Sequence, residues 1–70
     1  MKKLYELPRN TWIDISHLKL VDSDTNEPVF SLLFHNVDGA YSFCTTLEGK
    51  ILQLSASTEV NIITVNGDKL

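Results

Sequence analysis

Residues 36–51 read NVDGAYSFCTTLEGKI, and this stretch decides the fold class. Asp38-Gly39 and Glu48-Gly49 stand as two-residue breaks between runs in which apolar and polar side chains alternate. A two-residue hairpin loop needs positive φ angles, which glycine and aspartate tolerate. The stretch therefore predicts two consecutive β-hairpins.

Runs rich in β-branched and aromatic residues extend this pattern along the chain. Together with the hairpins they predict five strands, at residues 11–15, 29–36, 40–47, 50–55 and 60–65. Turn-forming residues 22–28 make the longest polar loop. This element order favours an all-β fold, a small five-stranded antiparallel SH3-like barrel, as a single domain over residues 1–70. The alternative is a flatter sheet that buries its apolar side in a homodimer.

The two loops also predict the strand register, which decides which side chains face the core. In that register Phe34 lies opposite Phe43, and Leu33 lies opposite Cys44. The predicted core face carries Phe30, Leu32, Phe34, Tyr41, Phe43, Leu52, Leu54 and Ala56. The predicted outer face carries His35, Ser42, Cys44, Thr46, Gln53 and Ser55.

Composition narrows the classes of partner. Six basic and nine acidic side chains give a net charge of −3, which argues against nucleic acid because phosphates are repelled. The single cysteine, Cys44, has no partner for an internal disulfide, which suits a reducing compartment. No apolar run reaches the roughly 20 residues of a membrane span, and Met1-Lys2-Lys3 leads into no signal-peptide apolar region. We therefore expect a cytoplasmic protein without a membrane partner.

The longest polar loop, residues 22–28, is here called the acidic loop, and it contains an incomplete metal-binding pattern. Asp22, Asp24 and Asn26 repeat the opening of a calcium-binding loop, in which alternate oxygens reach one ion. Glu27 stands where that loop needs glycine, and Leu33 stands where it needs a bidentate glutamate. The expected structure is a solvated turn in which the Asx side chains accept hydrogen bonds from nearby backbone N–H groups.

Cys44 and His35 share the predicted outer face and raise the question of a nucleophile with its base. In the predicted register they are diagonal neighbours, with Cβ atoms roughly 7 Å apart and parallel side chains. Free cysteine usually packs as a small hydrophobic residue. The two histidines of the chain lie on different elements without the ligand spacing of a zinc site. We therefore expect a protein that is not an enzyme and that holds no metal or cofactor.

The predicted outer face offers a surface for a partner instead. Apolar patches rimmed by polar groups mark protein interfaces. Trp12 either covers the core or anchors a partner. The predicted partner-binding residues are Val29, Leu33, His35, Val37, Ala40, Cys44, Ile51 and Trp12. The alternative is that the barrel bends enough to bury part of this set.

Three segments between residues 7 and 60 carry a resemblance: LPRNTW at 7–12, FHNVDGAYSFC at 34–44 and LSASTEV at 54–60. They resemble short uncharacterised accessory proteins of tailed bacteriophages. The resemblance implies a small protein of the bacterial host cytoplasm that binds and inhibits or redirects a host protein. One alternative is a structural or self-assembling, homodimeric virion component. Another is a weak single-stranded nucleic-acid-binding module, by analogy with other small barrels and through Arg9 and Trp12.

Overall fold

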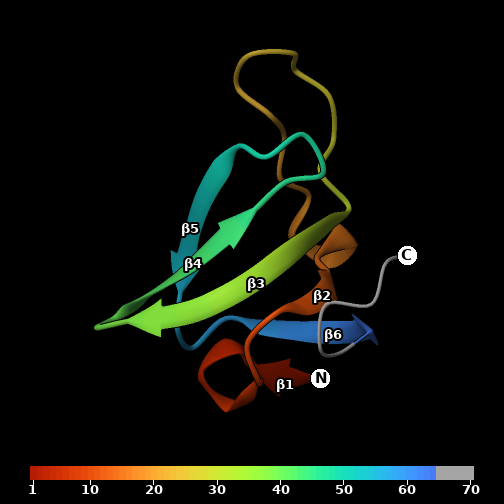
Figure 1. Cartoon of the computed structure of the whole chain (residues 1–70). Coiled ribbons are helices and arrows are strands. Elements are labelled where there is room, and N and C mark those ends of the chain that lie inside the picture. Colours follow the sequence, from red (N-terminus) through yellow and green to blue (C-terminus); the bar gives the residue numbers. More distant parts are fainter. Residues whose placement is uncertain (65–70) are drawn as a thin grey trace.

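The computed structural model describes residues 1–64, whose strands form one antiparallel sheet in the order β1-β6-β2-β3-β4-β5 (Figure 1). The strands are β1 Lys2–Lys3, β2 Thr11–Asp14, β3 Ser31–Asp38, β4 Tyr41–Thr45, β5 Ile51–Ser55 and β6 Glu59–Thr64. Two short 3-10 turns, η1 Leu4–Glu6 and η2 Ser16–Leu18, flank β2 along the chain. The prediction of an all-β, antiparallel fold is confirmed.

Over residues 1–64 the sheet has six strands instead of the predicted five, and these strands do not close into a barrel. The additional strand is β1, whose two residues are too few to show an alternating pattern in the sequence. Within residues 1–64, β1 at one end of the sheet pairs only with β6, and β5 at the other end pairs only with β4. Val65, the last residue of the predicted fifth strand, lies outside the described residues.

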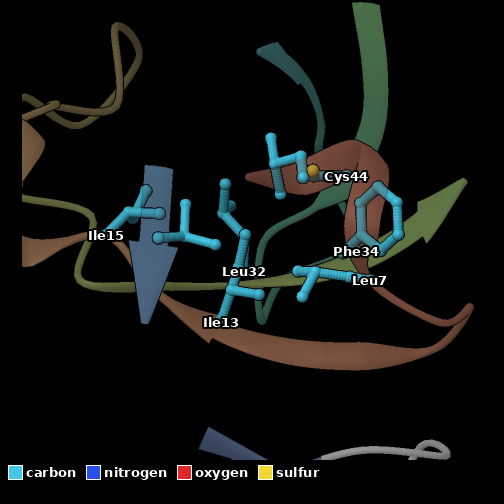
Figure 2. Packing of buried hydrophobic residues seen from close by; sticks show 8 residues of the cluster. Leu7, Ile13, Ile15, Leu32, Phe34 and Cys44 are labelled. Carbon is cyan, nitrogen blue, oxygen red and sulfur yellow. The ribbon is translucent and has the colours of Figure 1, made fainter. Parts of the chain in front are cut away.

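One face of the curved sheet, here called the inner face, holds the core (Figure 2). On β2 the alternation is regular, with Ile13 fully buried and Trp12 only partly covered. The segment before β2 also contributes, since the backbone N–H of Leu4 donates to the Thr58 carbonyl at 3.0 Å. The buried cluster consists of Leu4, Leu7, Ile13, Ile15, Leu32, Phe34, Cys44 and Val60.

The predicted register between β3 and β4 is wrong. Asp38 pairs with Tyr41, so the turn residues are Gly39 and Ala40, and Gly39 takes the positive φ of +65° that the turn needs. A β-bulge at His35 then changes the pairing, and Phe34 lies opposite Cys44 instead of Phe43. The extra residue of a bulge places the side chains on its two sides out of step with simple alternation.

The predicted register between β4 and β5 is wrong by one residue. The backbone N–H of Thr46 donates to the Lys50 carbonyl at 2.8 Å, which closes a loop of residues 47–49 instead of a two-residue loop. Gly49 has a φ of +87° in this loop. Cys44 consequently lies opposite Leu52 rather than Gln53.

These two changes turn β4 over relative to the prediction. Its small side chains, Ser42, Cys44 and Thr46, are buried on the inner face. Hydrogen bonds satisfy the polar ones: the Ser42 hydroxyl donates to the Leu54 carbonyl at 3.0 Å, and Thr46 Oγ1 accepts from the Lys50 N–H at 3.1 Å. The expectation that Tyr41 and Phe30 belong to the core is wrong, because both are more than half exposed.

Candidate functional site

The face of the sheet opposite the core, here called the outer face, carries a row of side chains that crosses four strands. Strand pairing puts Trp12 of β2 opposite Leu33 of β3, Leu33 opposite Thr45 of β4, and Thr45 opposite Ile51 of β5. Side chains at directly opposite positions stand about 5 Å apart and form one continuous surface. The row therefore joins residues that are widely separated in the sequence.

A second row lies beside the first and contains the aromatic residue Phe43. Phe43 lies opposite Asn36 of β3 and Gln53 of β5. Tyr41, two residues earlier on β4, has the same orientation and is 58% exposed. The outer face is defined by Trp12, Leu33, His35, Asn36, Tyr41, Phe43, Thr45, Ile51 and Gln53.

The bulge at His35 directs the imidazole onto this face. His35 Nε2 lies 2.9 Å from Thr45 Oγ1, and the ring meets Phe43 edge-on with a centroid distance of 5.3 Å and an interplanar angle of 64°. Such edge-to-face pairs are favourable and hold both rings in place. Bulges commonly re-aim a side chain in this manner. The result is a fixed imidazole and phenyl pair at the centre of the outer face.

The structure brings four of the eight predicted partner-binding residues together on the outer face: Trp12, Leu33, His35 and Ile51. Ala40 is exposed in the turn before β4, and Val29 is half-buried against the core before β3. Phe43 and Tyr41 belong to the face but were placed in the core by the predicted register.

The outward placement of Cys44 and Val37 is wrong. Cys44 is fully buried in the core beside Phe34, as Figure 2 shows, and Val37 packs against the same cluster. The bulge explains Val37, because the residues beyond it pair in a different register and Val37 lies opposite the buried Ser42. Neither side chain is available to a partner on the outer face.

The thiol of Cys44 sits in an environment that opposes ionisation. Burial raises the pKa of Cys44, and the contact with the Ser42 hydroxyl, at 3.5 Å from Sγ, offsets only part of that rise. His35 and Cys44 lie on opposite faces of the sheet, so the imidazole has no access to the thiol. The pair therefore has no geometry for nucleophilic catalysis.

The acidic loop holds an ion-pair cluster with Lys50. Lys50 Nζ lies 3.0 Å from an Asp22 carboxylate oxygen and 2.9 Å from one of Asp24. The backbone N–H of Asp24 and the Lys50 ammonium lower the pKa of Asp22, and Asp24 and Asp22 raise the pKa of Lys50. The expected Asx turn is present, since Asp22 Oδ1 accepts the Asp24 N–H at 2.8 Å. The ammonium thus ties the loop to the hairpin between β4 and β5.

Two clefts lie beside the sheet within residues 1–64. One is lined by Arg9, Asn10, His35 and Asn36. The other lies between the acidic loop and β5, and its lining includes Asp24, Ile51 and Gln53 together with Thr46 and Leu52 of the inner face. Only the first of these two clefts extends the outer face.

Comparison of the chain with protein-family models, curated proteins and solved structures found no match. Among the described residues, no helix is long and apolar enough to cross a membrane.

Proposed function

We propose that this protein is a non-enzymatic binding module that holds another protein on its outer face. The orientation of β4 carries the proposal, because this strand buries Ser42 and Cys44 while Phe43 and Tyr41 face outward. Fully burying a phenylalanine side chain contributes roughly 1.5–3 kcal/mol. Folding alone would favour the reverse orientation, so the outward-facing aromatic side chains support a role in contact with a partner.

The composition of the outer face supports a protein partner. Aromatic residues are enriched in the centre of protein interfaces, and a large rigid side chain loses little entropy when it is covered. Trp12, Leu33 and Phe43 are already half-buried within the sheet and are therefore held in place before binding. A fixed apolar centre with polar neighbours such as Asn36 and Gln53 fits this role.

Charge supports a partner with basic groups around an apolar centre. Asp14 and Asp38 lie at opposite ends of the outer face, and the chain as a whole has a net charge of −3. The Ser16 backbone N–H, which donates to Asp14 at 2.8 Å, lowers the pKa of this carboxyl and keeps it ionised. Complementary charge would steer a basic surface towards the face.

Together with the resemblance to phage accessory proteins, these features lead us to propose a bacterial host protein as the partner, which this chain inhibits or redirects by occupying its surface. We also propose an SH3-like architecture for β2 to β6. The strand order β6-β2-β3-β4-β5 and the long connection after β2 support that assignment.

Affinity capture from bacterial lysate with matched variants tests the proposal. Leu33→Asp places a charge in the middle of the outer face, while Leu47→Asp makes the same change at a 66% exposed site in the hairpin loop. Phe43→Ser removes apolar surface without adding charge. We expect one host protein in stoichiometric amount with wild type and Leu47→Asp, and its loss with Leu33→Asp and Phe43→Ser.

Circular dichroism of each variant separates loss of binding from loss of folding. Recovery of no stoichiometric protein with wild type would contradict the proposal. Equal recovery with folded Leu33→Asp would also contradict it, because the partner would then bind elsewhere.

A second candidate function is favoured by the cleft that Arg9 and Asn10 form with His35. It places a cation beside the aromatic residues of the outer face, an arrangement that single-stranded nucleic acid uses for backbone and base contacts. Binding of a labelled single-stranded oligonucleotide should then weaken steeply with salt and depend on Arg9 and Trp12. Absent or salt-insensitive binding would remove this candidate.

A further inference from the structure

The two edges of the sheet are protected to very different degrees. At one edge, β1 has only two residues and both are lysines. At the other edge, β5 has the five uncharged residues Ile51–Ser55, with no proline and no bulge. Short strands, lysines, prolines and bulges are the devices that keep edge strands from pairing with other chains. The β5 edge has none of them.

The hydrogen-bond ladder shows which backbone groups of β5 remain open. Just before β5, the Lys50 carbonyl accepts a hydrogen bond from the Thr46 N–H at 2.8 Å. Just after β5, the Ala56 N–H donates to the Ala40 carbonyl at 2.9 Å. In an antiparallel ladder the bonded pairs alternate with unbonded ones, so Leu52 and Leu54 also bond to β4. The N–H and C=O groups of Ile51 and Gln53 therefore point away from β4, towards the open edge.

We propose that β5 pairs antiparallel with β5 of a second copy of this chain, about a two-fold axis at Gln53. The sequence of the strand, ILQLS, is symmetric about this residue at the neighbouring positions, where leucine stands on both sides. Gln53 of each copy exchanges both N–H···O=C bonds with its counterpart, and Ile51 lies opposite Ser55 of the other copy. The two sheets become one continuous sheet.

The same register places leucine against leucine on the inner face. Leu52 of one copy lies opposite Leu54 of the other in an unbonded pair, the type in which side chains approach most closely. Both leucines are only half-buried in the single chain, although they pack against the core cluster. Pairing covers their remaining apolar surface.

β5 itself carries no charge that would oppose a second copy at this edge. The net charge of −3 makes two copies repel each other at most approaches, but β5 itself carries no charge. In the proposed register Lys50 lies opposite Ala56, so no like charges meet directly. A cleft separates Ile51, Leu52 and Gln53 of β5 from the acidic loop.

Sedimentation equilibrium over a concentration range tests the proposal. The range should reach about 500 µM, because an interface this small binds weakly. Gln53→Lys brings two like charges together on the two-fold axis, and we expect it to raise the dissociation constant of the dimer about tenfold or more. Asn61→Lys makes the same change of charge on β6, away from the edge, and should leave the dimer unchanged.

Gln53→Pro removes the N–H that points to the open edge without removing a bond to β4, so it should also abolish the dimer. Leu33→Asp, which changes the outer face on β3, should leave the dimer intact, and this separates the present proposal from the proposed function. A wild-type chain that stays monomeric at all concentrations would overturn the proposal. So would a dimer that survives Gln53→Lys and Gln53→Pro but is lost with Leu33→Asp.

Hydrogen exchange provides a residue-level readout. The amides of Leu52 and Leu54 should be protected at every concentration, since they bond to β4. The amides of Ile51 and Gln53 should gain protection of about tenfold or more only as the concentration rises through the dimer range. Protection of these two amides that does not change with concentration would overturn the proposed pairing.

Discussion

β3 and β4 are neighbouring strands that each carry a phenylalanine, yet the two rings lie on opposite faces of the sheet. Phe34 is 2% exposed in the core, whereas Phe43 lies half-buried on the outer face against His35. Across from Phe34, β4 contributes the thiol of Cys44. The bulge at His35 and the length of the loop between β4 and β5 therefore determine the orientation of β4, against the preference of its aromatic residues for the interior.

We expect the largest difference in the free energy of unfolding between the two matched variants Phe34→Ala and Phe43→Ala. Phe34→Ala leaves a cavity in the core and should lower the free energy of unfolding by about 3–5 kcal/mol. Phe43→Ala removes a half-covered ring and its contact with His35, and should cost about 1 kcal/mol. Urea denaturation of both variants measures the difference. Equal losses would mean that the two rings contribute equally to the core.

We expect a smaller difference in the free energy of unfolding between variants of Cys44 and Thr45, the two residues that follow Phe43. Cys44→Ser puts a further hydroxyl into the core beside that of Ser42 and should lower the free energy of unfolding by about 1–3 kcal/mol. Thr45→Ser, one residue later on the outer face, should change it by less than about 0.5 kcal/mol. The same urea experiment measures both variants, and a larger loss for Thr45→Ser would reverse the assignment of the faces.

The buried thiol also predicts a dependence of stability on pH. Because burial raises the pKa of Cys44 above the ordinary value of 9.0, the folded chain keeps the thiol protonated while the unfolded chain ionises it. The stabilisation is complete below pH 9 and is lost as the pH rises through the raised pKa. Denaturation midpoints of wild type should therefore fall faster above pH 9 than those of Cys44→Ala, and parallel curves would contradict buried protonation.

The smallest expected change is a shift in the pKa of Asp22, which lies in the acidic loop and belongs to neither face. Asp22 has a lowered pKa, so its stabilising contribution is present above its ordinary pKa of 3.8 and is lost as the pH falls through the lowered value. In Lys50→Gln the pKa of Asp22 should rise but stay below its ordinary value, because the Asp24 N–H still donates. Carboxyl chemical shifts measured against pH test this, and an unchanged Asp22 pKa would argue against the ion pair.

Much of the fold followed from local patterns. The five predicted strands match β2 to β6 within one or two residues wherever the structure describes them, because alternation and turn formers are visible in sequence. The missing parts were β1 and the contribution of Leu4 and Leu7 to the core. A two-residue strand and a short turn leave no periodic signal, and their burial depends on pairing with β6 and the Thr58 carbonyl.

The outer face was harder to predict because it depends on register. Four residues that were expected to bind a partner do share one face: Trp12, Leu33, His35 and Ile51. Cys44 was expected there too but is buried, and Phe43 lies on this face instead. Both alternating sets on β4 contain side chains that tolerate burial, so the pattern does not choose between them. The bulge at His35 determines which of the two sets is buried, and a bulge leaves no clear pattern in a single sequence.

In the proposed function, the outward aromatic residues of β4 contact another protein. A photoreactive phenylalanine analogue at position 43, compared with the same analogue at the exposed loop position 47, tests this contact in bacterial cells. After illumination we expect a covalent product with one cellular protein from position 43 and none from position 47. A product from position 47 alone, or from neither position, would contradict it.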